Sequence, residues 1–163
     1  MGGGDELSVL AEVAVALAGF SGIVVAIQSS DRVHPWDTYR AAVLLSTGFT
    51  MLLLALLPSA LYSFGVAGPS LWRLSSALSI PIVLAPVFIG YRYTPEDFTS
   101  SPYFQEIRLG MVVLVVVAVA ANSINALALG TPGVFSLFYI AILSHIPSTA
   151  LQFLVVILIR PPN

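Results

Sequence analysis

Long apolar stretches dominate the chain, and short polar segments interrupt them at intervals. A membrane core of about 30 Å needs roughly 20 mostly apolar residues in a helix. Five stretches meet this length, and the segments between them carry the proline, glycine and serine residues typical of turns. The pattern predicts an all-α integral membrane bundle of five transmembrane helices that forms one domain over residues 1–163. The expected spans are approximately 7–28, 39–66, 71–91, 107–129 and 134–159.

The connections and prolines add detail to this pattern. The four residues GTPG at 130–133 join the last two spans, so we expect these helices to be adjacent and antiparallel. A proline inside a helix lacks the N–H that the carbonyl one turn earlier needs, so it predicts a kink. Kinks are expected at Pro81, Pro86 and Pro147.

The composition supports a membrane protein and excludes several function classes. Hydrophobic residues make up 58% of the chain and charged residues only 9%, whereas soluble domains are about 25% charged. The net charge of −2 and the absence of lysine leave no basic surface for nucleic acid and no lysine for a Schiff base. Without cysteine there is no disulfide and no thiolate metal site. The two histidines, His34 and His145, are too far apart for a metal pair.

The arginines predict an orientation, since all six basic residues are arginines. Five of them flank the spans on one side of the membrane, and Arg73 alone lies on the other side. Because positive charge concentrates in cytoplasmic loops, we expect the N-terminus outside and the C-terminus in the cytoplasm. The five cytoplasmic arginines are Arg32, Arg40, Arg92, Arg108 and Arg160.

Three stretches of the chain carry a resemblance. They are LAEVAVALAGFSGIVVAI, LPSALYSFGVAGPSLWRLSSAL and the terminal LQFLVVIL. In this order they resemble a group of small, uncharacterised multi-pass proteins of the bacterial inner membrane, with an "AE…AGF.GIV" first helix, an "LLP…LWRL.SAL" region and a closing "QF" helix. The resemblance implies a cytoplasmic-membrane location and this topology, and it implies no activity.

Glu12 is the one acidic residue well inside the first span. Small residues such as Ala11, Gly19 and Gly22 share its side of the helix, and small residues let a second helix approach closely, so we expect Glu12 to face protein. An ionised carboxylate at this depth needs a partner or a proton. A structural ion pair with Arg73 is the first interpretation. The alternatives are a functional carboxylate that binds a cation or proton, and a side chain that reaches the membrane surface.

Two further groups of polar residues lie inside expected spans. Asn122 and Asn125 are three residues apart on one face, and asparagine is costly in lipid, so both should hydrogen-bond across a helix interface or line a polar cavity. The second group has the spacing i, i+3, i+4, i+7 of one helical stripe beside Pro147. We expect it to point into the bundle or an oligomer axis, next to Asn122 or Thr50. Its members are His145, Ser148, Thr149 and Gln152.

These residues leave two classes of function open. The first is a small channel or transport-type protein, self-associated in the membrane, whose polar interior or ion path consists of Glu12, both asparagines and the His145 stripe. The second is an accessory or scaffold subunit of a membrane complex, in which the same residues hold helices together. No nucleophile–base pair and no metal-ligand set is apparent, so we expect neither an enzyme nor a cofactor. The expected partners are membrane lipid and either a second copy or another membrane protein.

Overall fold

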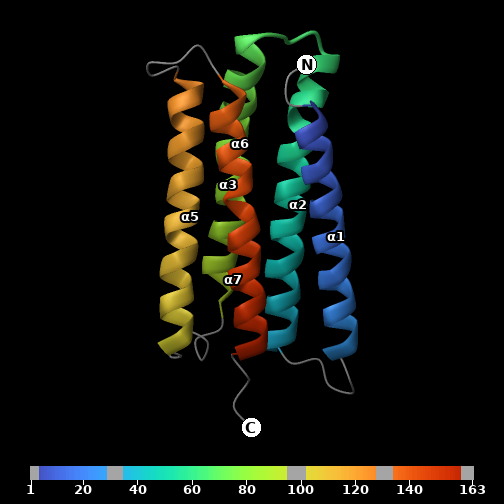
Figure 1. The fold of residues 1–163 in the computed structure, drawn as a ribbon. Helices are drawn as coiled ribbons and strands as arrows, with labels where there is room; N and C mark the ends of the chain where they lie inside the picture. Colours follow the sequence, from blue (N-terminus) through green and yellow to red (C-terminus); the bar gives the residue numbers. More distant parts are fainter. Residues whose placement is uncertain (1–3, 29–34, 95–101, 128–133, 159–163) are drawn as a thin grey trace.

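The protein is an all-helical bundle over the residues that its computed structural model describes, which are 4–28, 35–94, 102–127 and 134–158 (Figure 1). The helices follow the expected spans closely, because each begins and ends near the polar segments noted above. The fifth expected span is divided into two helical segments in one rod. The helices are α1 (Gly4–Gln28), α2 (Pro35–Ser63), α3 (Pro69–Tyr93), α5 (Pro102–Ala126), α6 (Phe135–Leu143) and α7 (His145–Leu158).

Within the described residues, three helices are long and apolar enough to cross a membrane. They include Ala41–Ser63 of α2, Pro69–Arg92 of α3 and Phe104–Ala126 of α5. These correspond to the second, third and fourth expected spans. In the first expected span, the side chains at several positions of α1 are not described. The fifth expected span is divided between α6 and α7. Those two spans remain predictions.

Four rods form a ring, and α1 lies outside it (Figure 1). Helix α2 packs against α3, α3 against α5, and α5 against the α6–α7 rod, which closes the ring on α2. The expected adjacency of the last two spans is therefore confirmed, and α5 runs antiparallel to the α6–α7 rod. Over the described residues, no Cα atom of α1 lies within 8 Å of a Cα atom in any helix other than α2. Helix α1 is thus a flanking helix whose backbone is close to α2 alone.

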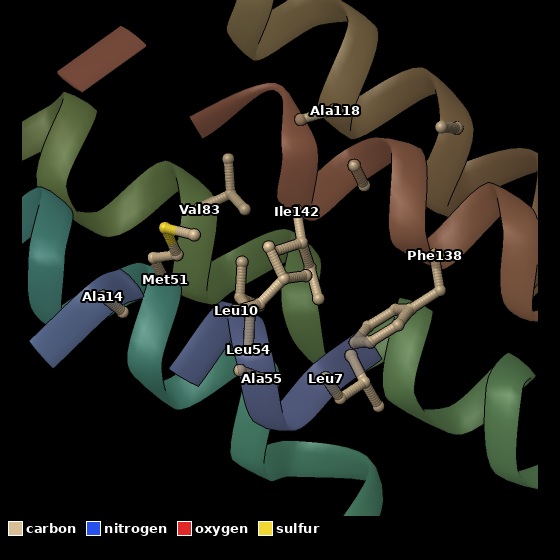
Figure 2. Packing of buried hydrophobic residues seen from close by; sticks show 12 residues of the cluster. Leu7, Leu10, Ala14, Met51, Leu54, Ala55, Val83, Ala118, Phe138 and Ile142 are labelled. Atoms are coloured by element: carbon tan, nitrogen blue, oxygen red, sulfur yellow. The ribbon is translucent and has the colours of Figure 1, made fainter. Parts of the chain in front are cut away.

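One apolar cluster connects α1 to the ring. It is centred on Phe138 and Ile142 of α6, which are fully buried (Figure 2). Large apolar side chains also lie on the outside, where Phe88 is 70% and Val116 is 59% exposed. An exterior of this kind suits contact with lipid tails, so it agrees with membrane association. The other members of the cluster are Leu7, Leu10, Ala14, Met51, Leu54, Ala55, Val83, Ala118, Ala121 and Ala141.

A main-chain turn joins α2 to α3. The Val66 N–H donates to the Leu61 carbonyl at 3.2 Å, and the Gly65 N–H donates to the Tyr62 carbonyl at 2.9 Å. This pair of bonds is the Schellman motif, which requires a left-handed residue that glycine adopts most easily. Gly65 has a φ of 87°, and Pro69 then opens α3. The FGVAGP segment therefore encodes a tight reversal between two antiparallel helices.

The last rod is interrupted at Ser144, which separates α6 from α7 three residues before Pro147. The kink expected at Pro147 itself remains a prediction. Pro147 cannot donate to the carbonyl of Leu143, which lies four residues earlier. The Ser144 hydroxyl does not replace that donor, since it donates to the Ala141 carbonyl at 2.7 Å.

The remaining prolines do not end their helices. Helix α3 continues through Pro81 and Pro86, and α2 continues through Pro58. The sequence pattern did not single out Pro58, although it is fully buried. Kinks at Pro81 and Pro86 remain predictions.

Candidate functional site

Asn125 ties three helices together at the end of the bundle where α5 gives way to α6. Its amide nitrogen donates to Ser76 Oγ at 2.8 Å and to the Val134 carbonyl at 3.0 Å. Its Oδ1 accepts the Val134 N–H at 2.7 Å. A further contact with the Trp72 carbonyl, at 3.4 Å, is longer than a good hydrogen bond. The expected bond across a helix interface is confirmed for Asn125, which joins α5 to α3 and to the residue before α6.

Aromatic rings cover the same end of the bundle. The ring centroid of Trp72 lies 5.1 Å from that of Phe135 and 6.0 Å from that of Phe138. Phe135 in turn lies 5.1 Å from Tyr139. These distances are those of favourable aromatic pairs. The rings therefore pack beside the Asn125 bonds and shield that end of the interior.

Asn122 lies one turn away from Asn125 and behaves differently. Both residues are completely buried, but neither Nδ2 nor Oδ1 of Asn122 has a hydrogen-bond partner among the described residues. Ser75 Oγ is also buried without a partner. A buried polar group that has lost its hydrogen bonds to water and has no partner in the protein lowers the free energy of unfolding by about 1–3 kcal/mol. The expected interhelical bond is therefore absent for Asn122.

The His145 stripe points into the bundle, as expected. His145 and Ser148 are each 8% exposed, and Thr149 is 1% exposed. Their hydrogen bonds are local, however, and do not reach Asn122 or Thr50. His145 Nδ1 lies 3.0 Å from the Ala141 carbonyl, and Thr149 Oγ1 donates to the His145 carbonyl at 2.8 Å. Because a carbonyl only accepts, Nδ1 must carry a proton when this contact is a hydrogen bond.

Gln152 continues this stripe toward α2. Thr47 Oγ1 lies 2.7 Å from Gln152 Oε1 and 2.9 Å from the Val43 carbonyl. The hydroxyl has one proton, so it donates fully to only one of them. With the Gln152 amide turned over, its NH₂ group would donate to Thr47, and the hydroxyl would donate to Val43. In both arrangements Gln152 ties α7 to α2, the helix that also carries Thr50.

The structure corrects the prediction for Glu12. Helix α1 packs through Leu7, Leu10 and Ala14, whereas Glu12 is exposed. Arg73 is exposed too, and over the described residues no Cα of α1 lies within 8 Å of α3. One chain therefore has no Glu12–Arg73 ion pair, and Glu12 is not part of its polar interior.

The close approach of α1 to α2 explains this difference. A Cβ atom added to Gly48 of α2 would lie 3.1 Å from the Cβ of Ala18. Gly19 and Gly22, which were expected on the packed side, would meet nothing within 4 Å. The glycine that allows the helices to approach is on α2, and α1 contributes leucine and alanine.

Two partners were missed by sequence reasoning. Ser76 bonds Asn125 across 49 positions, and Thr47 bonds Gln152 across 105. A third tie, from Tyr39 Oη to Thr94 Oγ1 at 3.0 Å, links the start of α2 to the end of α3. No signal in a single sequence pairs positions so far apart.

The arrangement can hold helices together with neutral hydrogen bonds. In the described part of the chain, no three histidine, aspartate or glutamate side chains are grouped to hold a metal ion; His34 lies outside the described residues. Comparisons with protein-family models, curated proteins and solved structures gave no match for the chain.

Proposed function

We propose that the protein is an accessory or scaffold subunit of the bacterial cytoplasmic membrane, with no conduction path of its own. The observation that supports this best is the internal hydrogen bonding of several polar residues in the interior. Asn125 and Gln152 bond neighbouring helices, whereas His145 and Thr149 bond carbonyls within one turn. A path for ions needs polar groups that stay available to the moving species. Asn125 and Gln152 therefore hold helices together, and the Thr149 hydroxyl is used within its own helix.

Flux through vesicles tests this proposal. The purified chain in proteoliposomes should pass protons and potassium ions no faster than protein-free vesicles, measured with a pH-sensitive dye and a potassium electrode. A protein-dependent flux that His145→Ala or Asn122→Leu alters would contradict the proposal.

A transport-type function is the second candidate, because one observation favours it. The unpaired groups of Asn122 and Ser75 are available for a species that carries its own hydrogen-bonding groups. Their cost to stability of about 1–3 kcal/mol each is easier to understand if they serve such a species. If the protein transports such a species, Asn122→Leu should abolish the protein-dependent flux. Asn125→Asp should leave that flux detectable.

The proposed topology has five spans, with the N-terminus outside and the C-terminus cytoplasmic. It is supported by the uneven distribution of the arginines, and by the three helices that are long and apolar enough to cross a membrane. Reporter fusions after residue 33 and at the C-terminus should both report the cytoplasm. A fusion that reports the outside would show that the arginine distribution does not orient this chain.

A further inference from the structure

The side of α1 that points away from α2 carries small and polar residues between large apolar ones. Its centre is a line of exposed residues at helical spacing, Ser8, Glu12, Ala16 and Gly19. Exposed large apolar side chains such as Val9 and Val15 flank this line, and others cover the exteriors of α3 and α5. In a membrane, small residues at such spacing let a second helix approach closely. This line, which we call the outer stripe of α1, is therefore suited to helix contact.

The outer stripe also carries a charge without a partner. Among the described residues, Glu12 has neither an ion pair nor a side-chain hydrogen bond, and the same is true of Arg73 on the exposed side of α3. A carboxylate in a span is costly unless it is paired or protonated. Asp5 and Glu6 in the first turn of α1 are exposed as well, so one chain presents an acidic face on α1 and Arg73 on the separate exposed face of α3.

The two charges lie in the same half of the bundle. Helices α1 and α3 both begin at the end drawn at the top of Figure 1. Leu7 lies beside Phe138 in the buried cluster (Figure 2), and the ring of Phe138 is 6.0 Å from that of Trp72, so Leu7 and Trp72 are roughly level. At 1.5 Å per residue, Glu12 then lies about 6 Å deeper than Arg73. Two long side chains can close an offset of this size.

We propose that the outer stripe of α1 binds α3 of a second copy, with Glu12 paired to Arg73 of the partner subunit. The inference rests on the proposed scaffold function and names the partner as the chain itself. Charge complementarity selects this partner, because the pair satisfies both groups at once. Each copy presents the acidic face on α1 and the basic face on α3, so the contact is head-to-tail and closes into a ring when the rotation permits.

The absence of cysteine in the chain allows a direct test. One tagged chain carries Ala16→Cys on the outer stripe, and a differently tagged chain carries Ala77→Cys, one turn after Arg73. Both charges are kept. A short bismaleimide added to the mixed chains in liposomes should produce a cross-linked dimer that carries both tags. Ile124→Cys, on the exposed side of α5 at about the same depth, is the matched control and should give little product with Ala16→Cys.

Charge variants separate the ion pair from simple proximity. Glu12→Arg or Arg73→Glu alone should lower the cross-linked yield several-fold, and the two exchanges together should restore it. Three results would each overturn the inference. They are a cross-linked yield at Ile124 equal to that at Ala77, the absence of any cross-linked dimer, and a double charge exchange that does not restore the yield. The two proposals can fail separately. A chain that cross-links and also conducts ions contradicts only the scaffold function. A chain that neither cross-links nor conducts ions contradicts only the contact between copies.

Discussion

Replacing Asn125 with leucine should lower the free energy of unfolding by about 2–4 kcal/mol, one of the two largest effects we expect. The substitution removes three hydrogen bonds and leaves Ser76 and the backbone of Val134 without their partner. Leaving a buried group unpaired costs more than the bond itself contributes. Thermal unfolding of the purified variant in detergent, followed by circular dichroism, measures the loss.

Asn122 provides the matched control, because it has the same side chain, the same helix and the same complete burial. Asn122→Leu removes two unpaired polar atoms and no hydrogen bond, so it should be neutral or stabilising. Ser76→Ala, which removes one of the acceptors of Asn125, should cost about 1 kcal/mol. An equal loss from both asparagine variants would mean that hydrogen bonding does not distinguish the two positions.

Gly48→Leu should displace α1 from α2 and lower the free energy of unfolding by about 1–3 kcal/mol or more. Even a Cβ atom at this position would lie 3.1 Å from the Cβ and 3.3 Å from the Cα of Ala18. The Cα belongs to a helix backbone and cannot turn aside as a flexible side chain can. Because α1 has its close backbone contact with α2 alone, no other helix compensates. Maleimide labelling of Leu10→Cys, at a position that is buried in the native bundle, should become faster.

Gly22→Leu is the control for this experiment, since a Cβ atom there would meet nothing within 4 Å. Both substitutions gain about 1 kcal/mol of helix propensity, so their difference isolates the steric effect. If Gly22→Leu released α1 as readily as Gly48→Leu, the close approach at Ala18 would not be what holds α1 to the bundle.

The local features of the fold were determined by the sequence. Long apolar stretches specify the helices because a span must satisfy its own backbone hydrogen bonds in lipid. Gly65 and Pro69 specify the reversal between α2 and α3, since one adopts a left-handed conformation easily and the other favours the first position of a helix. Pro147 leaves the carbonyl of Leu143 without its helical donor in the last rod. Each of these effects acts within a few residues, so a pattern along the chain contains it.

The tertiary structure decided which side of each helix is covered. Helix α1 is apolar on nearly every side, so the pattern does not distinguish lipid from protein, and Glu12 was assigned to the wrong side. The same limit explains the two asparagines: they share a face, yet only Asn125 meets Ser76 and Val134. Hydrogen bonds and helix contacts in lipid depend on the rotation and register of neighbouring helices. The rotation and register are set by packing between segments that are distant in the sequence. The pattern of residues along one helix does not contain this information.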